Sequence, residues 1–168
     1  MSRGYIYHIS KDPLAIPGID ESDFAEDIQS IGCDYVSNTD PSVVKENLET
    51  LKNRLRACGF SVMTENLPDD CAFSFITGKD LQLNECQKRW FEGKFRRFKG
   101  LAEKLTANEF SCGTSSVYQL ETALHDRFSD AAYLDMGTGP AFYTFDRFMR
   151  TLEPETEYFV ENACVYMH

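Results

Sequence analysis

The segment from Asp40 to Gly59 most limits what this chain can fold into, because it predicts a helix with one apolar stripe. Apolar residues recur at alternating spacings of four and three, at Val44, Leu48, Leu51, Leu55 and Cys58. Asp40 is a favourable N-cap, and Pro41 suits the first helical position because its missing N–H is not needed there. A helix with a single apolar stripe must pack on another layer, so the rest of the chain has to supply one.

Runs of alternating apolar residues supply that layer as β-strands. Strands are predicted at residues 4–10, 33–37, 60–65, 71–77, 131–136 and 157–167. The third and fourth are joined by Asn66-Leu67-Pro68-Asp69-Asp70, a turn-forming sequence that predicts a hairpin. The last strand carries apolar residues on both faces, which is typical of an interior strand covered on two sides.

Further helices are predicted at residues 21–31, 81–105 and 117–128, and after Gly139-Pro140. A capping box from Ser116 to Gln119 is predicted to begin the helix at 117–128, and its inward residues are expected to be Val117, Leu120, Leu124 and Phe128. The helix after Pro140 would carry Phe142, Phe145, Met149 and Leu152 on one face. The expected fold class is α+β, one domain over residues 1–168, with a mixed, largely antiparallel sheet of about five to six strands and about five helices packed on it.

Composition places this chain among globular proteins that build a core. It has 168 residues, of which 42% are hydrophobic and 13% aromatic, and a chain of this size buries most of its apolar surface without disulfides. No apolar run is long enough to span a membrane, and the N-terminus has no secretory signal pattern. Six cysteines without a Cys-x-x-Cys pair are expected to be reduced thiols, so a cytoplasmic location is expected, with no membrane association. Neither a metal site nor a cofactor is expected, because the three histidines form no pair at ligand spacing.

Charge is distributed very unevenly along the chain. The net charge is −10. Eight acids and no base lie between Asp12 and Val44, whereas residues 88–99 hold six bases and one acid, a net charge of +5. The remainder of the chain therefore carries −15. Such a distribution is typical of solvated faces, and it is also how charged contact surfaces arise.

The basic segment interleaves cations with aromatic residues and is the first candidate site. Its candidate contact residues are Lys88, Arg89, Trp90, Lys94, Arg96, Arg97 and Lys99. Phe91, Phe95, Phe98, Ala102 and Leu105 share one face and are expected to be core residues, with Trp90 partly exposed at the edge of that face. Three interpretations stay open: a helix whose cations balance the acids of this protein, a surface that binds an acidic protein, or a surface that binds nucleic acid.

The acidic N-terminal region is the second candidate. Asp20, Asp23 and Asp27 would lie near one face of the helix predicted at 21–31, with Glu26 to the side. Such a face is usually only solvated, but it also resembles the way acidic inhibitor proteins imitate a nucleic-acid backbone. This comparison concerns a class of proteins and rests on charge alone.

Cys112 is the third candidate, as the nucleophile of an enzyme or the centre of a small-molecule site. It precedes a predicted helix N-terminus, which would lower the pKa of its thiol. His125 lies too far along that helix to act as its base, and His8 would reach it only through tertiary folding. A structural thiol is therefore the simpler interpretation. The function expected from the sequence is a non-enzymatic regulatory module that binds a protein, with an enzyme or nucleic-acid binding as the alternatives.

Overall fold

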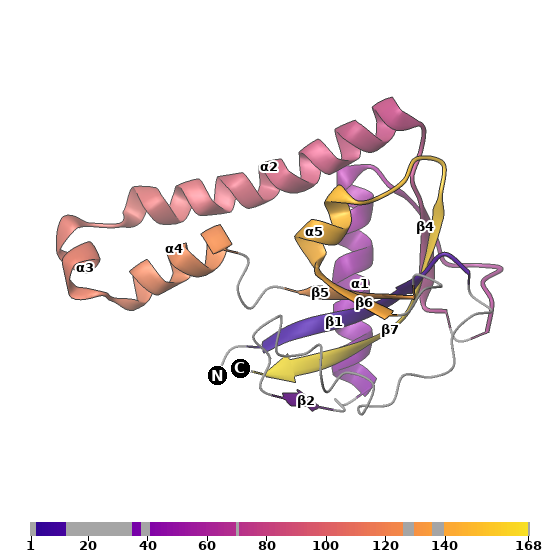
Figure 1. Ribbon diagram of the computed structural model, residues 1–168, viewed down its shortest axis with the longest axis horizontal. Coiled ribbons are helices and arrows are strands. Elements are labelled where there is room, and N and C mark those ends of the chain that lie inside the picture. Colours follow the sequence, from indigo (N-terminus) through magenta and orange to yellow (C-terminus); the bar gives the residue numbers. More distant parts are fainter. Residues whose placement is uncertain are drawn as a thin grey trace.

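Seven strands and five helices make up the described part of a computed structural model of this chain, which covers residues 3–12, 35–37, 41–69, 71–125, 130–135 and 140–167 (Figure 1). The helices are α1 (Pro41–Cys58), α2 (Asp80–Lys104), α3 (Ala107–Cys112), α4 (Ser115–His125) and α5 (Phe145–Arg150). The strands are β1 (Arg3–Ser10), β2 (Tyr35–Ser37), β3 (Ser61–Met63), β4 (Phe73–Ile76), β5 (Ala131–Asp135), β6 (Pro140–Thr144) and β7 (Glu157–Met167). The helix predicted at 21–31 lies outside the described residues.

All seven strands form one mixed sheet in the order β3-β4-β7-β1-β5-β6, with β2 also paired to β7. Only β1 and β5 pair in parallel; the other pairs among the described strands are antiparallel. The long strand β7 pairs with β1 along one edge and with both β4 and β2 along the other. The predicted α+β class, the antiparallel character of the sheet, the β3–β4 hairpin and the interior position of β7 are confirmed.

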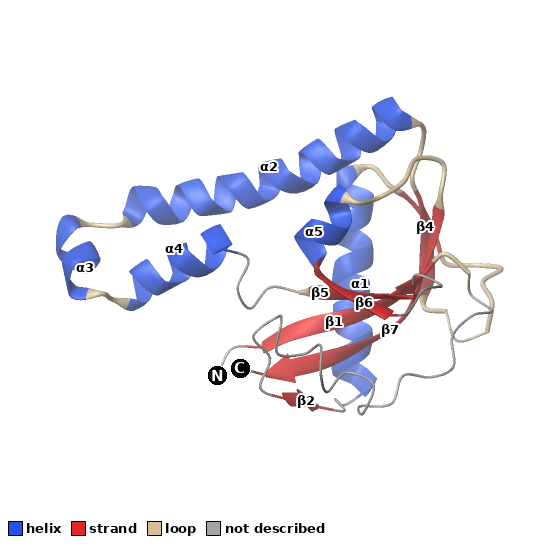
Figure 2. Cartoon of the chain, viewed as in Figure 1, coloured by secondary structure: helices blue, strands red, loops and turns tan. Residues whose placement is uncertain are grey.

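One face of the sheet and three helices enclose the main core (Figure 2). Tyr7 and Ile9 of β1 belong to this core, whereas the alternate residues Ile6 and His8 do not, as the period of a strand requires. From the helices the core takes Leu51, Leu55, Cys58, Leu83, Cys86, Trp90, Phe145, Phe148 and Met149. The predicted stripe of α1 therefore faces the sheet. Burial raises the pKa of the Cys58 and Cys86 thiols, which pack in the core as small apolar groups.

The predicted helix after Gly139-Pro140 is wrong over its first residues. Pro140 to Thr144 form the edge strand β6, antiparallel to β5, and Phe142 pairs with Tyr133 in that ladder. The helix begins only at Phe145, where the Thr144 hydroxyl accepts a hydrogen bond from the Arg147 N–H at 3.2 Å. Ala141-Phe142-Tyr143-Thr144 is rich in residues that favour a strand, and this preference decides the outcome where the apolar spacing fits both structures.

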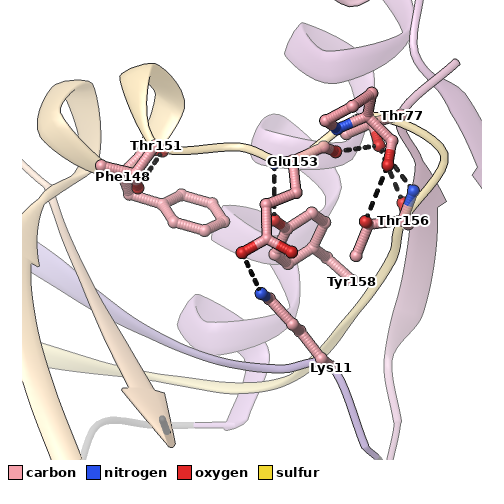
Figure 3. A network of polar contacts seen from close by, with 8 residues as sticks. Lys11, Thr77, Phe148, Thr151, Glu153, Thr156 and Tyr158 are labelled. Atoms are coloured by element: carbon pink, nitrogen blue, oxygen red, sulfur yellow. Dashed lines mark hydrogen bonds and ion pairs between the residues drawn. The ribbon is translucent and has the colours of Figure 1, made fainter. Parts of the chain in front are cut away.

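Hydrogen bonds fix the turn that leads from α5 into β7 (Figure 3). The fully buried Thr77 hydroxyl lies 2.5 Å from the Glu153 carbonyl oxygen and 3.0 Å from that of Thr156, and it accepts a hydrogen bond from the Thr156 N–H at 2.9 Å. The Glu153 N–H donates to the Tyr158 hydroxyl at 3.0 Å, and its carboxylate pairs with Lys11 at 2.5 Å. The turn therefore holds α5, β4 and β7 together and sets where α5 stands on the sheet.

Candidate protein interface on a projecting helical arm

Residues 91–125, which we call the arm, extend away from the sheet (Figure 1). They comprise the second half of α2, then α3, then α4, which runs back alongside α2. The other described residues form the body. Where side-chain burial in the arm is described, every residue is at least partly exposed, and none belongs to the main core except Phe91, which packs against its margin. The arm is therefore an addition to a core that the body completes by itself.

The first half of α2 fastens the arm to the body through Trp90. Its side chain is only 2% exposed, so the expectation that it lies partly exposed at a helix edge is wrong. The indole N–H donates to Asp146 Oδ1 at 2.8 Å, and Lys94 forms an ion pair with the same carboxylate. The indole ring stacks on Phe145, with centroids 5.3 Å apart, and the Arg54 guanidinium lies 3.5 Å from the indole centroid.

The tip of the arm is organised by a capping box at α3. The Thr106 hydroxyl accepts from the Glu109 N–H at 3.3 Å, and the Glu109 carboxylate accepts from the Thr106 N–H at 3.0 Å. Glu109 also accepts from the Ser116 hydroxyl at 3.1 Å, which links α3 to α4. These hydrogen bonds, that from the Thr106 N–H first, lower the pKa of Glu109. The box predicted from Ser116 to Gln119 is wrong, because Ser116 lies inside α4.

Large apolar side chains of the arm are exposed on all three of its helices. Four of the seven exposed large apolar residues in the described part of the chain lie here: Phe95 at 63%, Phe110 at 68%, Tyr118 at 50% and Leu124 at 59%. Phe95 and Leu124 were expected to point inward, so those predictions are wrong, whereas Val117 and Leu120 are half-buried. Single exposed apolar residues are ordinary on protein surfaces. Their concentration on a projection without a core of its own is typical of a contact surface.

The cations predicted as contact residues lie around α2 in different environments. Lys88, Arg89, Arg96, Arg97 and Lys99 are exposed, whereas Lys94 is half-buried and paired with Asp146. Lys99 forms a 3.7 Å pair with Glu103 one turn further on. Lys94 and Lys99 thus balance acids of this protein, as one interpretation of the sequence expected. Arg96 and Arg97 make no ion pair within the described residues and are available to a partner.

Three arginines at the base of the arm were not among the contact residues predicted from the sequence. Arg54 lies over Trp90, Arg150 over Phe91 at 4.8 Å from the ring centroid, and Arg147 over Tyr143 at 4.5 Å. They come from α1 and α5, so only the fold brings Arg54 and Arg150 against α2, whereas Arg147 stacks on a residue of β6. A local charge count misses them because they are spread over two helices and do not form a run such as residues 88–99. Their positions beside the buried residues of α1 and α5 could have indicated them, since such positions lie at the margins of the buried helix faces.

The other two candidates differ from expectation in different ways. Asp20, Asp23, Glu26 and Asp27 lie outside the described residues. Cys112 is exposed, and it is the last residue of α3, three residues before α4 begins. Its sulfur lies 3.9 Å from Asn108 Oδ1 and 3.9 Å from the Ser111 hydroxyl, and neither side chain is a general base.

A buried polar group on β1 and β7 is a further arrangement that the sequence did not indicate. The pairing of these strands shifts between His8 and Ile9, where Glu161 is the extra residue of a bulge. Glu161 Oε2 lies 2.9 Å from His8 Nδ1, and Oε1 accepts from the Ser10 hydroxyl at 3.4 Å. His8 and Ser10 are buried, and the Glu161 side chain is only 12% exposed. The bulge thus brings a carboxylate to a histidine inside the sheet, where each compensates the burial of the other.

Comparison with protein-family models, with curated protein sequences and with solved structures finds no match to this chain. Within the described residues no group of three or more His, Cys, Asp or Glu side chains is placed to hold a metal ion. No helix in that part of the chain is both long and apolar enough to cross a membrane.

Proposed function

We propose that this chain is a non-enzymatic regulatory module that binds another protein through the arm. The observation that carries the proposal is the combination of exposed Phe95, Phe110, Tyr118 and Leu124 with an arm whose described residues, apart from Phe91 at its base, make no part of the core. Aromatic residues and arginine are enriched where proteins bind one another, because they bury large areas and leave few donors unsatisfied. The capping box at Thr106 and the Trp90 anchor support the proposal, since they hold the arm in one shape before binding.

The proposal is tested by a pull-down from the native host with the double variant Phe95→Ser, Phe110→Ser as one bait. Both side chains are mostly exposed, so the double variant is expected to fold with a stability within about 1 kcal/mol of the original. It is expected to lose the proteins that the original chain retains. The original chain and the variant are immobilised at the same density, and the proteins that each retains after washing are identified by mass spectrometry.

The matched control is Leu81→Ser, which removes an apolar side chain that is even more exposed, at 84%, from the first turn of α2, outside the arm. We expect this variant to retain the same partners as the original chain. If the double variant also retains them, the arm is not the contact surface. If Leu81→Ser loses them as well, general surface apolarity and not the arm explains the retention.

A further inference from the structure

The three stacked arginines at the base of the arm suggest the chemistry of the partner. Arg54, Arg147 and Arg150 each hold the guanidinium against an aromatic ring, and all three residues are exposed. Stacking occupies a face of the guanidinium and leaves its N–H groups free at the edge. A guanidinium held this way loses little side-chain freedom on binding, and its fork matches the two oxygens of a carboxylate.

Little in the described part of this chain neutralises these guanidinium groups, although Arg54 lies near the largely buried carboxyl of Asp130, whose pKa burial raises and Arg54 lowers. None of the three forms an ion pair within the described residues, whereas Lys94 beside them is already paired with Asp146. Arg96 and Arg97 extend the same excess of positive charge along the arm. We propose that the partner bound by the arm is an acidic amphipathic helix of another protein, whose carboxylates are received by Arg54, Arg147 and Arg150 and whose apolar residues cover Phe95. This inference rests on the proposed function and specifies its partner.

The same surface is poorly suited to a nucleic acid. Glu92, Glu103 and Glu121 are exposed on the arm among its cations, where a continuous phosphate backbone would meet them. Apolar side chains such as Leu124 offer no flat surface for a base. An acidic amphipathic helix fits both the interrupted positive charge and the exposed apolar side chains, because it presents carboxylates at intervals and apolar residues between them. The stretch of α2 from Phe91 to Lys104 is about 20 Å long, so a helix of about 14 residues would cover it.

The test is fluorescence anisotropy with labelled peptides of about 18 residues. One peptide carries leucine on one helical face and glutamate elsewhere, and a second replaces every glutamate by glutamine. A single-stranded oligonucleotide of matched length is the third probe. We expect saturable binding of the glutamate peptide, tighter by about tenfold than that of the glutamine peptide and weaker as salt rises. Equal binding of the two peptides, no saturable binding of the glutamate peptide, or tighter binding of the oligonucleotide would overturn the inference.

Variants then locate the contact. Arg54→Gln, Arg147→Gln, Arg150→Gln is expected to weaken binding of the glutamate peptide by about tenfold. The matched control, Lys45→Gln, Arg56→Gln, Lys79→Gln, removes the same charge from exposed positions that face elsewhere, since Arg56 lies two residues from Arg54 and therefore on another side of α1, and should change binding by no more than about twofold. Arg147→Gln, Arg150→Gln, which leaves the Trp90 contact intact, is measured beside the triple variant to guard against unfolding and is expected to lose part of the affinity.

Equal loss in the control, or unchanged affinity in both stacked-arginine variants, would refute the role of these arginines. Neither result would affect the pull-down with the Phe95 and Phe110 variant. The proposed function therefore stands or fails separately from the identity of its partner.

Discussion

Asp146 joins the arm to the body through two donors from α2. It is only 6% exposed, yet one carboxylate oxygen accepts from the Trp90 indole and the other pairs with Lys94. A buried carboxylate is costly unless such partners compensate it. Both donors lie on the helix that becomes the arm, so this single side chain fixes the direction in which α2 leaves the body.

Replacing Asp146 separates the hydrogen bond from the charge. Asp146→Ala leaves the buried Trp90 N–H without an acceptor, and we expect a loss of about 2 kcal/mol in the free energy of unfolding. Asp146→Asn keeps an acceptor for the indole and loses only the pairing with Lys94, so we expect a loss of about 1 kcal/mol or less. Urea unfolding followed by Trp90 fluorescence measures both. Equal destabilisation by the two variants would mean that the charge, and not the hydrogen bond, anchors the arm.

Among the elements, α3 is short and depends on its cap. In the folded protein the pKa of the Glu109 carboxyl is lowered, because its charged form accepts hydrogen bonds from Thr106 and Ser116. A lowered pKa means that the stabilisation is present above the unfolded-state pKa and is lost as the pH falls through the folded-state pKa. The capping of α3 is therefore expected to weaken in acid.

This pH dependence is measured by the Cα chemical shifts of residues 107–112. In the original chain we expect these shifts to lose helical character between about pH 5 and pH 3, around and below the ordinary titration range of glutamate. Glu109→Gln retains an acceptor at this position of the box but does not titrate. Its shifts should stay constant over the same range as long as the body remains folded. An identical pH profile in the two proteins would show that another group is responsible.

Helix α2 shows how far the sequence predicts an element and where prediction fails. Its extent was predicted to within one residue at each end, because the apolar and charged residues repeat with a helical period throughout. The face of α2 that is buried was not predicted correctly. The aromatic series through Phe91, Phe95 and Phe98 indicated one stripe, whereas Leu83, Cys86 and Trp90 form the stripe that is buried. Periodicity gives the faces of a helix, but only tertiary structure determines how far the body extends beneath it.

The site shows the same limit. The cations of residues 88–99 were visible in the sequence because they are adjacent, and most of them are indeed exposed. Arg54, Arg147 and Arg150 belong to two other helices and come together only when both pack on the sheet. Strand β6 was missed for a different reason, since the spacing of Phe142 and Phe145 fits a helix as well as a strand followed by a helix. Contacts between distant segments decided the positions of the three arginines, whereas the strand preference of residues 141–144 decided β6.

The whole molecule divides into a body that holds the core and an arm that projects from it (Figure 2). The two ends of the arm meet the body close together. Trp90 stacks on Phe145, and the Phe145 N–H donates to the Asp130 carbonyl at 2.7 Å. A Gly-Ser linker of about six residues reaches up to about 20 Å. It is therefore long enough to join Lys94 to Asp130 and replace the part of the arm beyond Lys94.

We expect the chain with residues 95–129 replaced by such a Gly-Ser linker to fold, because the described residues removed contribute nothing to the main core. Its unfolding should remain cooperative and cost about 2 kcal/mol of stability at most, since only surface contacts are lost. By comparison, Phe148→Ala in the body, where the side chain is 1% exposed, should cost about 3–5 kcal/mol. The protein with the linker should keep the fluorescence emission of a buried Trp90 and should retain none of the partners of the full chain. Loss of the cooperative transition would show that the arm stabilises the sheet, and retention of the partners would place the contact surface on the body.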